Sequence, residues 1–250
     1  MSHITNPNLD RRSFIRVGGW VVLAFTAGPV SRNASAQPSP VKIGIIGAGH
    51  IGSTIGTLWV KSGHPVMFSS RHPEELKSLV DGLGNLAHAG TVSQAIDFGD
   101  VVFIAVPYGA LPEIGKAYSS KLFGKVVIDA GNAVAARDGS DLTAETKDEG
   151  IGVTSAKLLP GARVVRAFNS MGYKFFESEA NRSGDRMAIP IAGDDKDALD
   201  IASSLVHDAG FDPVVIGPLA TAKDFSQGNP LYGLQLTAAQ MREKAASLKQ

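Results

Sequence analysis

From residue 41 onward, short apolar runs of strand length alternate with stretches in which apolar residues recur at helical spacing. Two of the runs, 101–106 and 125–129, lack the alternation of a half-exposed strand, which is typical of a parallel sheet covered on both faces. The pattern predicts strands at 41–46, in a run that ends at Phe68, and at 86–88, 101–106, 125–129, 164–168, 187–192 and 213–216.

The stretches between these runs predict helices. One begins near Ile51 and stops at Gly63, and the others lie at 73–83, 92–98, 111–118, 153–159, 195–209 and 231–248. Residues 131–150 are polar and rich in small side chains, so we expect a long loop that contains a little helix there.

Strands continue to residue 216, so the second half of the chain extends the sheet and leaves no room for an all-helical substrate domain. We predict one α/β domain over residues 37–250, with a Rossmann-type, doubly wound and mostly parallel sheet, extended by C-terminal strands and followed by a C-terminal helix. That helix has an apolar face, and we favour its packing on its own domain over packing on a second subunit in a homodimer.

Residues 1–36 have the features of an export signal. Arg11 and Arg12 precede a moderately apolar stretch at 17–28, and 34–36 read Ala-Ser-Ala, a signal-cleavage pattern. The apolar stretch is shorter than the roughly 20 residues that span a bilayer, so we expect no stable membrane insertion. We predict a twin-arginine signal peptide and export of the folded protein to the periplasm or another extracytoplasmic space; the alternative is a signal that stays uncleaved.

Composition narrows the chemistry. Lysine plus arginine (24) balance aspartate plus glutamate (24), so no basic surface for nucleic acid is indicated. The chain has no cysteine, which excludes disulfides, thiolate metal sites and cysteine nucleophiles, and its six histidines show no metal-ligand spacing. We therefore predict neither a metal site nor a nucleic-acid partner.

The first apolar run ends in a glycine-rich turn that opens the following helix. Gly47 allows the tight turn, Gly49 lets the backbone approach a pyrophosphate, and Gly52 lets the helix pack close to the strand. Free N–H groups at the start of the helix would face the phosphates. The turn predicts a dinucleotide site on Gly47, Ala48, Gly49, His50, Ile51 and Gly52; the alternative is a glycine turn that binds nothing.

The end of the second strand indicates which dinucleotide. NAD-binding folds usually carry Asp or Glu at this place, whereas this chain has Ser69, Ser70 and Arg71. A carboxylate would repel a 2′-phosphate, while a hydroxyl and a guanidinium bind one well. The cofactor predicted is therefore NADP(H).

Three later strands end in residues that we expect to border the nicotinamide, because ligands of open α/β sheets bind beyond the carboxyl ends of the strands. These residues are Val106, Pro107, Asn132, Ala167, Phe168 and Asn169. No triad, paired carboxylates or lysine-based acid/base group is evident, so the catalytic residues stay unassigned. Hydride transfer to a flavin-like ring depends more on positioning than on a general acid.

Residues 41–250 resemble the NADPH-dependent oxidoreductases typified by the NADP:coenzyme F420 oxidoreductases of archaea and actinobacteria. The resemblance rests on IGIIGAGHIG at 43–52, FSSR at 68–71, IAVP at 104–107, VVIDAGN at 126–132, VVRAFNSM at 164–171 and the segment 193–222. It implies a pyrophosphate on 47–52, a 2′-phosphate on Ser70 and Arg71, and a nicotinamide near Val106, Pro107 and 167–169. His50 and Ile51 stand where archaeal members carry polar residues. The same fold serves as the NADPH-binding domain of membrane ferric reductases of the six-transmembrane epithelial antigen type.

We therefore expect an exported NADPH-dependent oxidoreductase that transfers hydride between NADP(H) and a flavin, a deazaflavin such as coenzyme F420, or a similar planar acceptor. One alternative is a non-catalytic NADP-binding sensor or partner protein. Another is an NADPH-dependent reductase of a small carbonyl or imine, which would need a buried proton donor over the nicotinamide.

Overall fold

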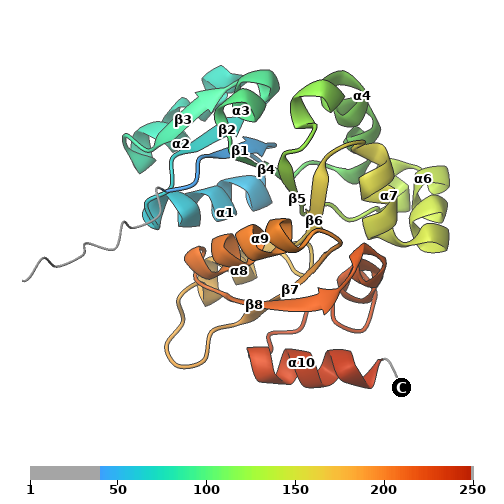
Figure 1. Cartoon of the computed structure of the whole chain (residues 1–250). Helices are drawn as coiled ribbons and strands as arrows, with labels where there is room; N and C mark the ends of the chain where they lie inside the picture. Colours follow the sequence, from blue (N-terminus) through green and yellow to red (C-terminus); the bar gives the residue numbers. More distant parts are fainter. Residues whose placement is uncertain (1–39, 249–250) are drawn as a thin grey trace, which may run out of the picture. The chain divides into compact units, whose positions relative to one another are not determined.

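The computed structural model describes residues 40–248, and the predicted export signal lies outside them. The described residues build one eight-stranded sheet with the order β3-β2-β1-β4-β5-β6-β7-β8 (Figure 1). The strands are β1 (Ile43–Ile46), β2 (Val66–Ser69), β3 (Ala87–Gly90), β4 (Val101–Ile104), β5 (Val126–Asp129), β6 (Arg163–Arg166), β7 (Ala188–Gly193) and β8 (Asp212–Gly217).

Helices fill the connections between the strands. The α-helices are α1 (His50–Lys61), α2 (Lys77–Leu83), α3 (Val92–Phe98), α4 (Leu111–Leu122), α5 (Ala135–Asp138), α6 (Ser140–Glu145), α7 (Ile151–Leu158), α8 (Tyr173–Glu179), α9 (Lys196–Asp208) and α10 (Ala238–Ser247). Short 3₁₀ or π segments are η1 (Pro73–Leu76), η2 (Tyr108–Ala110), η3 (Thr146–Gly150) and η4 (Leu219–Phe225).

The first six strands are parallel and in the order 3-2-1-4-5-6 of a dinucleotide-binding sheet. β7 runs antiparallel to β6, and β8 runs parallel to β7, so the last two strands extend the sheet in the reverse direction. The predicted fold is therefore confirmed. The strand order reverses between β1 and β4, and ligands of such sheets bind at that point.

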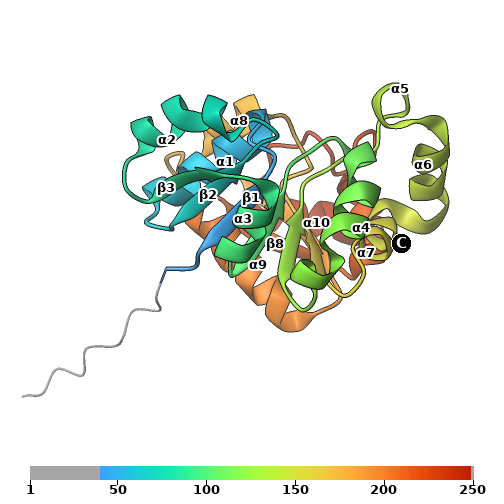
Figure 2. The same ribbon diagram turned by 90° about the horizontal axis from the view of Figure 1, so that it is seen from above.

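Each face of the sheet has its own apolar core. Figures 1 and 2 show α1, α8 and α9 on one face and α3, α4 and α7 on the other. Trp59 anchors the first core, where its indole N–H donates to the carbonyl of Leu205, 2.7 Å away, and its ring meets those of Phe103 and Phe168 edge-on. Burial of both faces explains why β1, β4 and β5 have no exposed position and, apart from Asp129, no polar side chain.

The expected loop at 131–150 is wrong, because α5, α6 and η3 make most of this stretch helical. The helices were not predicted because the small and polar residues of this stretch form no continuous apolar face at helical spacing. Two buried threonines instead satisfy their hydroxyls locally: Thr143 donates to the carbonyl of Gly139, and Thr146 donates to that of Thr143. The seven-residue α8 was likewise not predicted; one of its side chains, Phe176, is buried.

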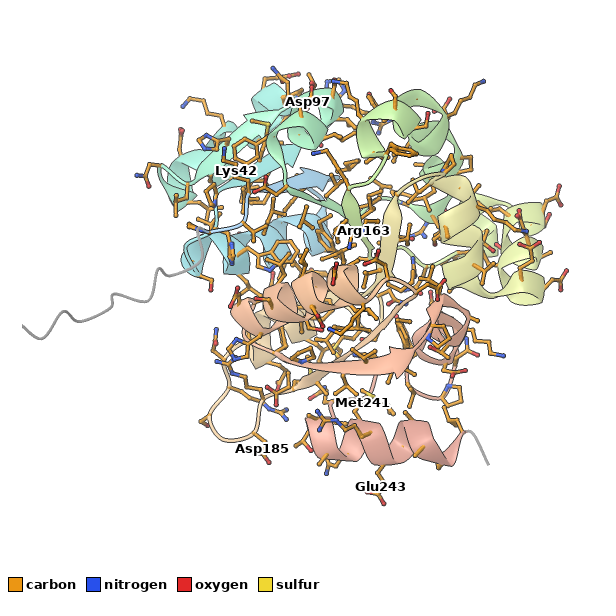
Figure 3. The ribbon with its side chains drawn as sticks, in the orientation of Figure 1. Lys42, Asp97, Arg163, Asp185, Met241 and Glu243 are labelled. Carbon is orange, nitrogen blue, oxygen red and sulfur yellow. The ribbon has the colours of Figure 1, made fainter. Side chains whose placement is uncertain are left out.

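The C-terminal helix begins at Ala238, later than the predicted 231. Gly233 has φ +74°, which interrupts a helix, and Thr237 and Gln240 form a capping box that starts the next one. Met241 is buried on the side of α10 that faces β8, while Glu243 points away (Figure 3). The helix thus packs on its own domain, as predicted. Within residues 40–248, no helix is long and apolar enough to cross a membrane.

Candidate functional site

Two cavities lie beyond the carboxyl ends of the parallel strands. The first, of about 740 Å³, is lined by the glycine turn, the end of β2 and the first turns of α4. The second, of about 480 Å³, is lined by the start of α1 and by the segments that follow β4, β5 and β6. Because Ala105, Val106 and Pro107 line both, the two cavities form one continuous groove, here called the dinucleotide groove.

The glycine turn is shaped by close backbone contacts. Gly47 has φ +97°, and a methyl group there would lie 2.6 Å from the carbonyl oxygen of Ala105. A methyl group at Gly52 would collide with the carbonyl oxygen of Gly47. A methyl group at Gly49 would instead meet nothing within 4 Å, so a ligand in the groove has room to approach the backbone of this residue.

The start of α1 is electropositive. Gly49 provides no side-chain cap, and the first turn of this twelve-residue helix holds no acidic residue. The N–H groups of the first turn therefore lack intrahelical partners and stand at the positive end of the helix dipole. This is the arrangement that binds a phosphate.

The three predicted residues at the end of β2 have different roles. The Ser69 hydroxyl is buried and donates to the carbonyl of Ile45 at 2.6 Å, so this side chain holds β1 and β2 together. The Ser70 hydroxyl accepts the backbone N–H of His72 at 3.0 Å. Arg71 lines the first cavity, is exposed, and makes no hydrogen bond or ion pair with any other residue in 40–248. Its guanidinium is therefore free to bind an anion.

Two asparagines meet in the second cavity. The Asn132 amide donates to the carbonyl of Asn169 at 2.7 Å, and the Asn169 amide donates to Asn132 Oδ1 at 3.4 Å. Asn169 is 2 % exposed, and its Oδ1 has no hydrogen-bond partner among the described residues. A buried acceptor without a donor is costly, so this atom suits the amide group of a ligand in the cavity.

Phe168 contributes backbone to the cavity and its side chain to the core. Its φ of +61° is uncommon for a residue with a side chain, and the turn sends the ring into a cluster with Trp59, Phe103, Phe176 and Phe211. Phe168 thus lines the second cavity, as expected of a residue that borders the nicotinamide, while its ring packs in the core. Ala167 and Gly52 line neither cavity, whereas the other predicted residues do.

A buried ion pair lies directly beneath the site. Asp129 ends β5 and Arg166 ends β6, in register with each other, and both side chains are fully buried. Arg166 donates to Asp129 and to the carbonyl of Gly131, and Asp129 accepts the N–H of Gly131 at 2.8 Å. The pair thus fixes the turn that carries Asn132. An arginine in an otherwise apolar strand requires a buried partner of opposite charge. Arg166, within the apolar run 164–168, is therefore the feature of the sequence that could have revealed this ion pair.

Tyr108 and Ser155 complete this network. The Ser155 hydroxyl donates to Asp129 at 2.8 Å and lies 3.0 Å from the Tyr108 hydroxyl. Burial, reinforced by the charge of Asp129, raises the pKa of Tyr108 far above its ordinary value. Tyr108 therefore stays neutral and serves the packing of the site.

Asp138 joins two loops of the groove by hydrogen bonds, and the sequence analysis did not predict this role. Its carboxylate accepts the N–H of Gly109 at 3.0 Å and that of Val134 at 2.8 Å, and it pairs with Arg137. Burial acts to raise the pKa of Asp138, but the hydrogen bonds from Arg137 and these N–H groups outweigh it and hold the pKa below its ordinary value. The loops after β4 and β5 are therefore joined through a charged carboxylate.

The residues fit NADP(H). The uncapped helix and the open backbone at Gly49 would hold the pyrophosphate, the unpartnered Arg71 would hold the 2′-phosphate, and Asn169 Oδ1 would accept from the nicotinamide amide. No group of three or more His, Cys, Asp or Glu side chains in 40–248 is placed to hold a metal ion.

Comparison with known proteins agrees with this geometry. The family described as NADP oxidoreductase, coenzyme F420-dependent, matches residues 42–133. A hypothetical protein from Sinorhizobium meliloti is 30 % identical, with 79 % of this chain and 95 % of that chain covered and a TM-score of 0.68. A protein assigned as an F420-dependent NADP reductase, from Arthrobacter sp. FB24, has the same fold at 20 % identity, covering 73 % of this chain and 87 % of that one with a TM-score of 0.59.

Metalloreductase STEAP3 of Rattus norvegicus is 27 % identical over 186 residues, which cover 73 % of this chain and 35 % of the relative. The chain thus spans about a third of the length of the curated relatives it matches. The family match covers the glycine turn, the end of β2 and the turns after β4 and β5, which are segments that build the dinucleotide groove. The chain belongs to the family described as NADP oxidoreductase, coenzyme F420-dependent.

Proposed function

We propose that the protein transfers hydride between NADP(H) and a flavin, a deazaflavin such as coenzyme F420, or a similar planar acceptor. The observation that carries the proposal is the second cavity, which continues the dinucleotide groove past Pro107 and is walled by Asn132, Asn169 and Tyr173. The nicotinamide end of the cofactor and an acceptor ring would meet there. The family description, which names coenzyme F420, supports this assignment.

Bound NADPH supplies the hydride, that is, two electrons and one proton. The chain's own residues orient the reactants: the α1 turn and Arg71 bind the phosphates, and the asparagine pair fixes the nicotinamide. The titratable aromatic side chains of the cavity wall, His50, Tyr173 and Tyr232, are all partly or fully exposed to solvent. A flavin or deazaflavin suits this wall, because such a ring takes its second proton from water once it has received hydride.

A reductase of a small carbonyl or imine would instead need a proton donor held away from water. Among the described residues that line the second cavity, no side chain with an exchangeable acidic proton is buried. This observation supports a planar acceptor over that alternative.

The test is NADPH oxidation by purified protein with riboflavin, coenzyme F420 or a small imine as acceptor. We expect turnover with a flavin or deazaflavin and none with the imine. Tight NADPH binding without turnover on any acceptor would favour the alternative of a non-catalytic sensor or partner protein.

We further propose that residues 1–36 direct export of the folded protein by the twin-arginine route. Arg11, Arg12 and the Ala-Ser-Ala segment support this, and export of a folded chain would let bound nucleotide travel with it. Residues 1–40 fused to a reporter should send it out of the cytoplasm, and replacing Arg11 and Arg12 with Lys should stop export. Unchanged export of that variant would contradict the proposal.

A further inference from the structure

A smaller polar cavity of about 200 Å³ adjoins the second cavity of the dinucleotide groove. It is lined by Asn132, Ala133, Thr143, Thr146, Lys147, Ile151, Lys223, Ser226, Gln227 and Asn229, and we call it the lysine cavity. Asn132 and Gln227 line both cavities, so a molecule that reaches the nicotinamide end of the groove can extend into the lysine cavity. The backbone N–H of Gln227 donates to Asn132 Oδ1 at 3.3 Å, which ties the two walls together.

The lysine cavity is positively charged. Lys147 and Lys223 are both exposed, and neither side chain makes a hydrogen bond or an ion pair with any other residue in 40–248. No carboxylate among the described residues lines the lysine cavity or the second cavity. The acidic neighbours in sequence, Asp148 and Asp224, are not among the lining residues. The two ammonium groups therefore lack a counter-charge at this place.

The other polar groups of the lysine cavity do not compensate the lysines. The hydroxyls of Thr143 and Thr146 donate to backbone carbonyls, and the Ser226 hydroxyl donates to the carbonyl of Lys223. The Asn229 amide donates to the Ser226 hydroxyl at 3.1 Å. The two lysines and the Gln227 side-chain amide are therefore the lining donors without any hydrogen-bond partner among the described residues. A set of donors around a positive charge selects an anion with several oxygen atoms.

The cofactor does not need this cavity. Its phosphates are accounted for at the far end of the groove, by the start of α1 and by Arg71, both outside the lysine cavity. An anion in the lysine cavity would therefore belong to the second reactant.

We propose that the lysine cavity binds an anionic group, a phosphate or a carboxylate, that is carried by the acceptor itself. This inference rests on the proposed function and narrows it: the acceptor is a planar redox ring with an anionic side chain, held by Lys147 and Lys223 while the ring lies at Asn132. The competing explanation, two solvated lysines, predicts no preference between charged and uncharged acceptors with the same ring.

The experiment compares three flavins that share one ring: riboflavin, which is uncharged, FMN, which carries a phosphate, and carboxymethylflavin, which carries a carboxylate. Binding is measured by flavin fluorescence with saturating NADP⁺, so that the cofactor's own phosphate sites are filled. We expect FMN to bind about tenfold more tightly than riboflavin, since it gains charge-assisted hydrogen bonds, with the advantage shrinking as salt is added. The carboxymethylflavin arm shows whether a carboxylate is held as well as a phosphate.

The variant carrying Lys147→Ala and Lys223→Ala together should lose this advantage and bind riboflavin as before. Lys244→Ala is the matched control and should not change flavin binding. Lys244 is an exposed lysine of α10 and lines neither the lysine cavity nor the dinucleotide groove. Unfolding temperatures of all variants check that the fold is intact.

Equal binding of FMN and riboflavin by the unaltered protein, or no binding of either flavin, would overturn the inference. If riboflavin is nevertheless reduced by NADPH, the proposed function stands without it. If FMN binds through the lysines but no NADPH is oxidised, the anion site stands and the oxidoreductase proposal for flavins fails.

Discussion

We expect the choice between NADPH and NADH to depend on Arg71. Arg71 has no hydrogen-bond or ion-pair partner among residues 40–248, so its replacement should lower the affinity for a ligand without lowering the stability of the fold. We expect Arg71→Ala to weaken NADPH binding by about ten- to a hundredfold, the range of a charge-assisted contact with a phosphate. NADH, which lacks the 2′-phosphate, should be unaffected.

Isothermal titration with both nucleotides measures the difference. Lys77→Ala is the control, because Lys77 lies near Arg71 in the chain and is already paired with Asp81 at 2.6 Å. An equal loss for NADPH and NADH would contradict the assignment of Arg71 to the 2′-phosphate.

Gly49 and Gly52 allow binding and folding to be separated. A methyl group at Gly49 points into open space, and the residue has φ −72°, so Gly49→Ala should fold normally and lose about tenfold or more in dinucleotide affinity, because the methyl fills the approach to the pyrophosphate. Gly52→Ala should instead lower the unfolding temperature, since its methyl collides with the Gly47 carbonyl. Thermal unfolding and nucleotide titration of both variants make the test; normal affinity in Gly49→Ala would argue against a pyrophosphate there.

At the residue scale, the sequence was most informative where chemistry depends on residue type alone. The close packing of Gly47 and Gly52 and the place of Arg71 at the first cavity could be predicted from the pattern and from charge. The Ser69 hydroxyl, bound to the Ile45 carbonyl, and the Phe168 ring, turned into the core, could not, because each depends on a backbone conformation that neighbouring elements impose.

At the scale of elements, the pair that joins β5 to β6 is the structural support of the site. Asp129→Asn keeps the shape and removes the charge, which leaves Arg166 buried without a counter-ion. We expect a loss of about 3–5 kcal/mol in the free energy of unfolding, measured by urea denaturation. Asp97→Asn is the control, because both side chains of its pair with Lys121 are exposed to solvent and the pair should contribute about 0–1 kcal/mol. A comparably small loss in Asp129→Asn would show that the buried pair does not support the fold.

The start of α9 gives a prediction about pH. The guanidinium of Arg163, with the N–H of Ala198, holds the pKa of Asp195 down to about 2, from an ordinary 3.8. Because the folded-state pKa is the lower one, this stabilisation is complete above about pH 5 and is lost as the pH falls through 4 towards 2.

Asp195→Asn should therefore be less stable than the unaltered protein at neutral pH and should show a shallower loss of stability between about pH 5 and 2. Urea midpoints across that range provide the measurement, with Asp185→Asn, at an exposed loop position without an ion pair to any described residue, as control. Parallel pH curves for Asp195→Asn and the unaltered protein would contradict the account.

Elements with a clear apolar pattern were predictable, and α3 agrees with its predicted bounds residue for residue. The stretch at 131–150 was not, because α5, α6 and η3 are held by threonine hydroxyls and by packing on other segments, neither of which leaves an apolar repeat. The start of α10 depended on the local conformation of Gly233, which composition does not fix.

At the scale of the whole molecule, the described residues form one α/β unit with two cores and no separate substrate domain. That organisation was predictable, because the strands continue to the end of β8. The lysine cavity was not, since the fold brings together Lys147 and Lys223, which lie far apart in the sequence. Without a separate substrate domain, we expect an acceptor to meet the cofactor at the sheet edge that carries the dinucleotide groove.

The most direct test of this account is a single-turnover experiment without oxygen, in which the protein is mixed with one equivalent of NADPH and one of FMN. We expect the absorbances of the reduced nicotinamide and of the oxidised flavin to fall together, in a one-to-one ratio, and Gly49→Ala to slow the reaction. Bound NADPH that keeps its absorbance while FMN and coenzyme F420 both remain oxidised would contradict it.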